Sequence, residues 1–280
     1  MGKRGIGWMG ELVILERVGP VAVLTLNRAE RHNSLVPEFL EAMLAALEIV
    51  GAQDGVRAVV LQANGRSFST GGDVRGFYEH LDDLEAYAGE IVGRLNSVIL
   101  AMVALPVPIV AAVQGIVTGG SMGLVLGSDI VLVTPEASFT PYYSVVGFSP
   151  DGGWTALLPA IIGLKRTGEV LIRNQTITAE QAVAWGLASR IVPVDRIREE
   201  ALSTAQDLAA MKAGSIGHTK ATLGPACSDL ESGLEAERSR FVQQIMTEEA
   251  RQGIEAFLGK RRAPARQDRK GTGGEHPAGL

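Results

Sequence analysis

The chain has 280 residues, 46% of them apolar, and a formal net charge of −5. A chain of this length can bury one large core, as one extended domain or as one domain with an appendage. Its negative charge argues against nucleic acid as the main partner, and its single cysteine, Cys227, excludes an internal disulfide framework and a cysteine-rich metal site.

The N-terminus lacks the uninterrupted apolar segment of a signal peptide. The most apolar run, residues 98–113, is interrupted by Pro106 and Pro108 and is too short for a comfortable membrane span. We therefore expect a cytoplasmic protein with no membrane contact. The strongly basic segment 259–270 is expected to be part of a solvated tail.

Buried strands alternate with amphipathic helices along the first two thirds of the chain. The pattern predicts strands at 21–27, 57–63, 108–115 and 129–134, helices at 36–50 and 84–105, and mostly helix from about residue 164 onward, including 178–186 and most of 196–258. This order predicts an α/β core followed by an all-α segment. We set the expected boundaries at 1–195 for the core with the active site, 196–262 for the helical segment and 263–280 for a disordered tail.

Two glycine motifs match known signatures without the context that those signatures need. Residues 5–10 fit G-x-G-x-x-G, but no strand precedes them, so a nucleotide site is not expected there. Residues 119–123 fit G-x-S-x-G around Ser121, and Asp151 and His218 follow in the order of a serine triad. Because the predicted strand ends at residue 115, well before Ser121, a serine hydrolase remains only a minor alternative.

Two glycine clusters, residues 68–74 and 118–124, each follow a predicted strand and are expected to open a helix. The first amides of a helix are unpaired donors at its positive end, and glycine lets a ligand approach the backbone closely. If two such amides converge on one oxygen, they form an oxyanion hole for an enolate or a tetrahedral intermediate.

Five segments resemble the enoyl-CoA hydratase/isomerase (crotonase) family in sequence, order and spacing. They are residues 26–35, 66–74, 108–132, 137–153 and 176–193, and the resemblance extends over about 12–260. It implies a β-β-α spiral core with a C-terminal all-α segment for trimerisation and CoA contact. It also implies an acyl-CoA thioester substrate, no cofactor beyond the coenzyme A of that substrate, and a homotrimer or hexamer.

Position by position, the resemblance assigns the oxyanion-hole amides to Gly72 and Gly120. It places Arg28 and Arg31 near the CoA phosphates, and it implies that the segment 256–262 reaches the adenine and phosphates bound by a neighbouring subunit. The full set of expected substrate-binding residues is Arg28, Arg31, Thr70, Tyr143, Phe148, Trp154, Phe257 and Lys260.

The catalytic acids depart from the hydratases of this family. Those enzymes use two glutamates, whose positions here hold Gly123 and Tyr143. Syn-hydration needs a water held between two carboxylates, so efficient hydration is not expected. Asp151 lies where 1,2-epoxyphenylacetyl-CoA isomerases, dienoyl-CoA isomerases and 4-chlorobenzoyl-CoA dehalogenases of the family have an acid. The dienoyl-CoA isomerases add a second acid, and the dehalogenases a tryptophan, at the position of Tyr143.

We therefore expect an enoyl-CoA isomerase in which Asp151 is the acid/base. Three alternatives stay open: Asp151 as the nucleophile of a hydrolase or dehalogenase, a hydratase, and an acyl-CoA binder without activity. Phe148, Trp154, Val145 and Val146 are expected to exclude water from Asp151 and raise its pKa, while Tyr142 and Tyr143 could line a pocket for an aromatic acyl group. The histidines show no ligand spacing, so no metal is expected.

Overall fold

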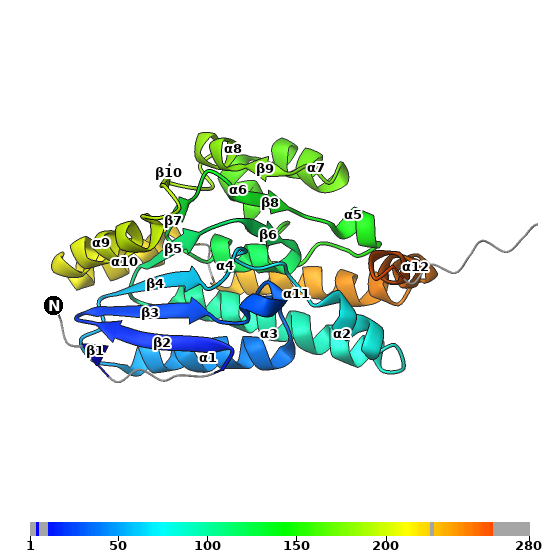
Figure 1. Ribbon diagram of the computed structural model, residues 1–280, viewed down its shortest axis with the longest axis horizontal. Coiled ribbons are helices and arrows are strands. Elements are labelled where there is room, and N and C mark those ends of the chain that lie inside the picture. Colours follow the sequence, from blue (N-terminus) through cyan, green and yellow to red (C-terminus); the bar gives the residue numbers. More distant parts are fainter. Residues whose placement is uncertain (1–3, 6–10, 225–226, 260–280) are drawn as a thin grey trace, which may run out of the picture.

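A seven-stranded mixed sheet forms the centre of the computed structural model, which describes residues 4–5, 11–224 and 227–259 (Figure 1). The first three strands pair antiparallel and the later ones pair parallel. The central strands are buried throughout because helices cover both faces of the sheet. The expected α/β class is therefore confirmed. In spatial order the strands are β1 (Arg4–Gly5), β2 (Val13–Val18), β3 (Val21–Leu26), β4 (Ala58–Ala63), β5 (Ile109–Val113), β7 (Ile130–Val133) and β10 (Arg190–Ile191).

A second, smaller sheet lies beside the first and consists of β6 (Ile116–Thr118), β8 (Ser138–Thr140) and β9 (Ile177–Thr178). Short segments from the earlier turns of the chain join this layer, because Ser69 bridges to Val117 and Leu35 bridges to Gly72. Each turn of the chain thus makes a strand in the large sheet, a short strand or bridge in the small layer, and then a helix. This β-β-α winding brings the segments after three strands together at one place.

Helices cover the two faces of the large sheet. On one face, α1 (Pro37–Ala52) and α3 (Leu84–Ala104) pack in the main core, together with α4 (Met122–Leu126) and α11 (Cys227–Ile245). On the other face, α9 (Ile197–Ala210) packs against β3, β4 and β5. Within the described residues, α3 alone is long and apolar enough to cross a membrane. Its apolar side chains instead pack between α1 and α11.

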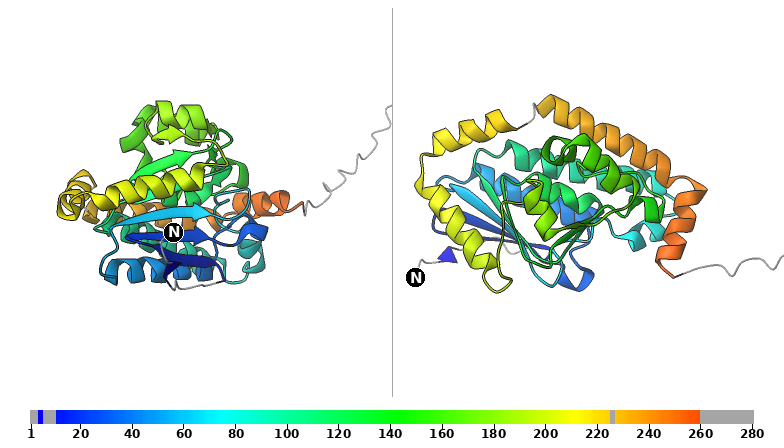
Figure 2. Two further views of the ribbon diagram at one scale, coloured as in Figure 1. Left: turned by 60° about the vertical axis from the view of Figure 1, so that its left-hand side comes forward. Right: turned by 90° about the horizontal axis from the view of Figure 1, so that it is seen from above.

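The C-terminal helices wrap around the rest of the molecule (Figure 2). After α9 the chain forms α10 (Ala213–Leu223) and α11, and then α12 (Glu248–Phe257) packs against α5 (Tyr143–Val146) and α2 (Val74–Glu79). The side chains of α11 and α12 belong to the main core, although the division into a core and a helical segment stays a prediction. The remaining helices are η1 (Ala29–Arg31), η2 (Gly119–Ser121), α6 (Leu158–Ile162), α7 (Leu164–Ile172) and α8 (Ala179–Ala184). The expected tail, 263–280, lies outside the described residues.

The predicted strands and long helices are all present, with ends shifted by a few residues. The strands that the sequence pattern did not indicate are β2 and the short β1, β6, β8, β9 and β10. Apart from β2, each of these strands has only two or three residues, which are too few positions to show alternation of apolar and polar side chains. The corner between β5 and β6 requires a glycine. Gly115 has φ of 62°, and a Cβ atom there would lie 2.1 Å from the carbonyl oxygen of Arg66.

Candidate active site

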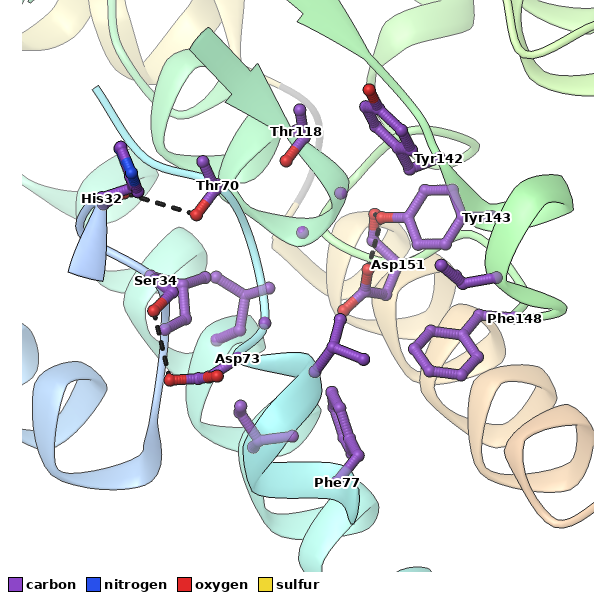
Figure 3. A pocket seen from close by; sticks show the side chains of 18 of the residues that line it. His32, Ser34, Thr70, Asp73, Phe77, Thr118, Tyr142, Tyr143, Phe148 and Asp151 are labelled. Carbon is purple, nitrogen blue, oxygen red and sulfur yellow. Dashed lines mark hydrogen bonds between the residues drawn. The ribbon is translucent and has the colours of Figure 1, made fainter. Parts of the chain in front are cut away.

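A cavity of about 410 Å³ opens where the small layer meets α2, α3 and α12 (Figure 3). Most of the residues that the sequence singled out lie on its wall. Of the expected substrate-binding residues, Arg28 and Trp154 do not line it, and Lys260 lies outside the described residues. The expected site residues that do line it are Arg31, Thr70, Gly72, Gly120, Tyr143, Phe148, Asp151 and Phe257.

The two glycine loops touch each other at this wall. Gly71 has φ of 73°, and a Cβ atom there would lie 2.5 Å from the carbonyl oxygen of Thr118, so only glycine allows this contact. The bridge to Leu35 uses the carbonyl of Gly71 and the amide of Asp73. This leaves the Gly72 amide between them without a backbone acceptor in the described part of the chain.

Gly120 supplies the second unpaired amide. It is the second residue of η2, and the first amides of a helix have no partner within that helix. Both Gly72 and Gly120 line the cavity. Two such main-chain donors at one wall could stabilise negative charge on a single substrate oxygen.

Asp151 lies against the second of these loops. A Cβ atom at Gly120 would be 2.9 Å from Oδ2 of Asp151. The next residue, Gly152, has φ of 66°, and its own Cβ atom would meet the Gly120 carbonyl oxygen at 2.4 Å. Two glycines therefore let the backbones on either side of the carboxylate pack together, and the carboxylate is held beside the Gly120 amide.

One oxygen of the Asp151 carboxylate is fixed and the other is free. The hydroxyl of Tyr143 donates to Oδ1 at 2.5 Å, as the facing side chains in Figure 3 illustrate. Oδ2 accepts no hydrogen bond from any other residue that the structure describes. The free oxygen can therefore accept a proton from a molecule in the cavity.

Burial raises the pKa of Asp151 to about 7, the hydrogen bond from Tyr143 opposes that rise, and the charge of Glu237 adds to it. Burial, and then the charge of Asp151, raise the pKa of Tyr143 well above its usual value, so its hydroxyl stays a donor. A carboxyl group with a pKa near neutrality can both take up and release a proton at physiological pH.

Aromatic rings close the cavity on the side of Asp151. Phe148 packs edge-on against Phe77 and Phe241, with ring centroids 5.6 and 5.4 Å away. Val146 lines the cavity, and its expected role in excluding water from Asp151 stays a prediction. The expectation for Val145 is wrong, because its side chain is 56% exposed.

Trp154 also has a different place from the one expected. The turn through Gly152 and Gly153, both with positive φ, directs its ring into the protein, where it is fully buried. Its indole Nε1 donates to the carbonyl oxygen of Gly119 at 2.8 Å. Trp154 therefore does not contact the cavity but holds the loop that presents the Gly120 amide.

Asp73 organises the arginines at the other end of the cavity. It caps α2 and pairs with Arg28 at 3.1 Å and with Arg31 at 3.2 Å. Burial would raise the pKa of Asp73, but the hydrogen bonds and charges of Arg31 and Arg28 outweigh burial and lower it. Arg28 also donates to Ser34 and lines a neighbouring pocket, so its guanidinium is not free to bind a phosphate in the cavity. The more exposed Arg31 does line the cavity.

Phe257 lines the cavity of its own chain, and its expected contact with a neighbouring subunit stays a prediction. Phe257 lies at this cavity because α12 packs closely on α5. A Cβ atom at Gly253 would lie 2.1 Å from the Val146 carbonyl oxygen, and one at Gly147 would lie 3.1 Å from the Cα atom of Ala250. These contacts fold α12 back onto its own chain.

The serine-hydrolase alternative has no support in the geometry. The strand β6 ends at Thr118, so a strand does precede Ser121 more closely than the sequence indicated. The hydroxyl of Ser121 is nevertheless buried and donates to the carbonyl oxygens of Ser69 and Thr118, at 2.9 and 2.7 Å. His218, on the exposed surface of α10, does not line the cavity.

Two features of the site were not found from the sequence. Ile99 fills the space beside Gly123: a Cβ atom at Gly123 would lie 2.4 Å from Cδ1 of Ile99 and 3.0 Å from the Gly152 carbonyl oxygen. Glu237 of α11 is buried and accepts hydrogen bonds from the turn after Asp151. Neither residue stands in a recognisable motif. Among the described residues, no group of three potential metal ligands gathers, so we find no metal site there.

Comparisons with known proteins agree on one family. The family described as enoyl-CoA hydratase/isomerase matches residues 16–268. The 1,2-epoxyphenylacetyl-CoA isomerase of Escherichia coli (strain K12) is 32% identical over 256 residues, covering 90% of this chain and 97% of that protein. An enoyl-CoA hydratase structure from Bacillus halodurans superposes with a TM-score of 0.82 at 26% identity, covering 88% of this chain and 99% of the other. These matches confirm the expected crotonase-like spiral fold.

Proposed function

Since the chain belongs to the enoyl-CoA hydratase/isomerase family of acyl-CoA enzymes, we propose that it is an enoyl-CoA isomerase with Asp151 as its acid/base. The observation that supports this most strongly is the free Oδ2 of Asp151 beside the Gly120 amide. In this proposal the thioester oxygen accepts hydrogen bonds from the amides of Gly72 and Gly120.

The chemistry follows from one carboxylate and two donors. Oδ2 of Asp151 removes a proton from C2 of a 3-enoyl-CoA, and the electron pair of that C–H bond forms an enolate whose charge rests on the thioester oxygen. The two amides stabilise this charge. The protonated Asp151 then returns the proton to C4, so the double bond moves from C3–C4 to C2–C3. Because the proton leaves and re-enters on one face, one carboxyl group is sufficient.

Hydration has less support because it needs a second carboxylate beside the water. The carboxylates that line the cavity are those of Glu30, Asp73 and Asp151. Asp73 is neutralised by two arginines, and the hydratase position at Gly123 has no room for a side chain. Asp151 is therefore left without a partner acid near the two amides.

The alternative in which Asp151 attacks the substrate as a nucleophile is also less favoured. A nucleophile and a base must both be ionised when the reaction starts, so the raised pKa of Asp151, about 7, does not by itself favour either role. Only the acid/base must afterwards give its proton back to the substrate, and a carboxyl group with a pKa near neutrality is suited to that second step. We keep the nucleophile as an outcome of the test.

The acyl group, the oligomer and the location in the cell belong to the proposal as well. Phe77, Phe148 and Phe241 make the inner end of the cavity apolar, which suits an aliphatic or an aromatic acyl group. Leu164 and Ile172 expose apolar side chains on α7, which fits a trimer or hexamer. The cytoplasmic location expected from the N-terminal sequence stays part of the proposal. Light scattering coupled to size-exclusion chromatography would test the oligomer.

The test of the function is a panel of 3-enoyl-, 2-enoyl- and aryl-CoA esters followed at the thioester chromophore. We expect turnover with 3-enoyl-CoA, and in D2O we expect hydrogen abstracted from C2 to reappear at C4 of the product. Asp151→Asn should reduce turnover by about 10²–10⁴-fold while CoA esters still bind. Turnover equal to that of the wild type would remove Asp151 from the mechanism. Incorporation of oxygen-18 from water into the Asp151 carboxylate would instead identify a nucleophile.

A further inference from the structure

Glu237 is a buried carboxylate that the proposed reaction does not use. It lies on α11, far from the active-site segments in sequence, and its side chain is almost completely inaccessible to solvent. Oε2 accepts from the amide of Gly153 at 2.8 Å. Oε1 accepts from the amide and hydroxyl of Thr155, both at 2.7 Å, and from the amide of Ala156 at 3.0 Å. No cation pairs with it among the described residues.

The turn that Glu237 holds is the one that fixes the proposed site. Asp151 begins this turn, and Gly152 packs against the backbone of Gly120. Trp154, in the middle of the same turn, donates to the carbonyl oxygen of Gly119. The turn therefore fixes both the carboxylate and the loop with the second amide donor, and Glu237 accepts from donors on three of its residues.

We propose that Glu237 is a positioning residue that fixes the Asp151 carboxylate relative to the Gly120 amide by accepting the hydrogen bonds of the turn between them. Glu237 does not line the cavity, so it acts through the turn and not by contact with substrate. This inference rests on the proposed role of Asp151 and extends it to the C-terminal helices. Four hydrogen bonds to one buried carboxylate hold a turn more rigidly than packing alone.

A second consequence is electrostatic. The titratable groups that act on Asp151 are Tyr143 from α5 and Glu237 from α11. From α3 and η2, the neighbours are Leu95 and Gly120, which carry no charge. Burial raises the pKa of Glu237 as well, while the hydrogen bonds from Thr155, Gly153 and Ala156 oppose that rise and favour its ionised form. Because a nearby negative charge disfavours a second one, the ionised Glu237 raises the pKa of Asp151. Loss of its charge, or entry of water into a loosened turn, would lower that pKa.

The test compares Glu237→Gln with Glu235→Gln, a control on the same helix. The exposed carboxylate of Glu235 pairs with Arg238 on the surface and with no other cation in the described part of the chain. A glutamine at position 237 keeps the size of the side chain but turns an amide NH2 toward the N–H of Gly153. We expect kcat for a 3-enoyl-CoA to fall about tenfold to a hundredfold, since small misplacements of a reacting group have effects of this size. The dissociation constant for butanoyl-CoA, which has no double bond to move, should be unchanged.

The readout that separates positioning from mere stability is the pKa of Asp151 in the free enzyme. It can be measured by infrared difference spectroscopy, with Asp151→Asn in the same background as the reference. We expect a lower pKa in Glu237→Gln and an unchanged one in Glu235→Gln. Values of kcat and of this pKa equal to those of the wild type in Glu237→Gln would overturn the inference.

If Glu237→Gln does not fold, Thr155→Val decides the question, because it removes one donor and keeps the shape of the turn. It should lower kcat and the pKa of Asp151 in the same direction, and wild-type values would overturn the inference. The infrared measurement needs no turnover. The proposed function can therefore fail, by wild-type turnover in Asp151→Asn, while the coupling of Glu237 to Asp151 is still measured.

Discussion

The hydroxyl of Tyr143 donates to Oδ1 of Asp151, and both side chains are buried beside the Gly120 loop. The family resemblance implies that hydratases have a glutamate at the position of Tyr143. In this chain the residue at that position donates a hydrogen bond to a carboxylate instead of providing a second one. The pair thus combines an oriented oxygen with a free one, and it makes the pH dependence of the proposed reaction a test of the site.

We predict that kcat/KM for a 3-enoyl-CoA rises with pH through about 7, because Asp151 acts as a base only when ionised and its pKa is raised to about 7. The hydrogen bond from Tyr143 stabilises the ionised form. In Tyr143→Phe the acidic limb should therefore move up by about one to two pH units, the equivalent of one hydrogen bond to a charged group.

The matched control for this prediction is Tyr142→Phe. Tyr142 also lines the cavity, but it does not contact Asp151 through a hydrogen bond. Its removal should leave the pH profile in place and affect KM at most. A limb that stays at the same pH in Tyr143→Phe would contradict the role assigned to the hydroxyl.

The same pKa predicts how stability depends on pH. The pKa of Asp151 is raised from 3.8 to about 7 by folding, so the folded state holds this proton more tightly than the unfolded chain. The contribution is fully present below about pH 4 and is lost as pH rises through 7. Asp151→Asn stays neutral, so it should gain stability relative to the wild type between pH 5 and pH 8, on the order of a few kcal/mol. Urea unfolding at pH 5 and at pH 8 measures the free energy of unfolding of both proteins. If the difference between Asp151→Asn and the wild type were the same at the two pH values, the prediction would be contradicted.

The contact between the two glycine loops leads to a third prediction. In Gly71→Ala a methyl group would meet the Thr118 carbonyl oxygen at 2.5 Å and push the loops apart. If the Gly72 and Gly120 amides form the proposed oxyanion hole, this separation should lower kcat by about 10²–10³-fold, the effect of losing one oxyanion donor. Gly19→Ala is the control, because Gly19 has a similar φ of 61° but no atom within 4 Å of its Cβ position. Equal kcat values in the two variants would argue against an oxyanion hole here.

The sequence revealed those parts of the site that depend on local backbone. The loops at Gly72 and Gly120 each follow a strand and open a helix, and this order is visible in the residues themselves. Asp151 was found because it stands in a segment with a family resemblance. These features depend on neighbours in the chain, so a linear pattern can indicate them.

The parts that were missed depend on contacts between distant segments. Trp154 turns away from the cavity because of the two positive φ angles before it, and Glu237 reaches the turn from a helix more than eighty residues later. Arg28 is held by Asp73, 45 residues away. No periodicity or motif at these positions distinguishes a residue that supports the site from one that touches the ligand.

Arg31 and Arg28 should respond differently to substitution. Arg31 lines the cavity, so Arg31→Ala should raise KM several-fold with kcat unchanged, as expected for lost ground-state binding. Because salt screens exposed charges, the difference from the wild type should shrink as ionic strength rises. Arg28 donates to Ser34 and Asp73 inside the protein, so Arg28→Ala should instead lower the free energy of unfolding. Steady-state kinetics at two salt concentrations measures these KM values. If KM rose in a salt-dependent way in Arg28→Ala and not in Arg31→Ala, the roles assigned to Arg28 and Arg31 would be reversed.

The packing of Ile99 on Gly123 predicts that the hydratase position cannot accept a side chain. In Gly123→Ala the new methyl group would lie 2.4 Å from Cδ1 of Ile99, and overpacking of this kind lowers the free energy of unfolding by about 1–3 kcal/mol. Ile99→Ala removes the clashing atoms, so the double variant should lose less than the sum of the two single losses. Urea unfolding of the four proteins gives this coupling energy, with Gly168→Ala, whose Cβ position has no neighbour within 4 Å, as the control. Additive losses would mean that the backbone yields at Gly123, and the position could then hold a catalytic acid after all.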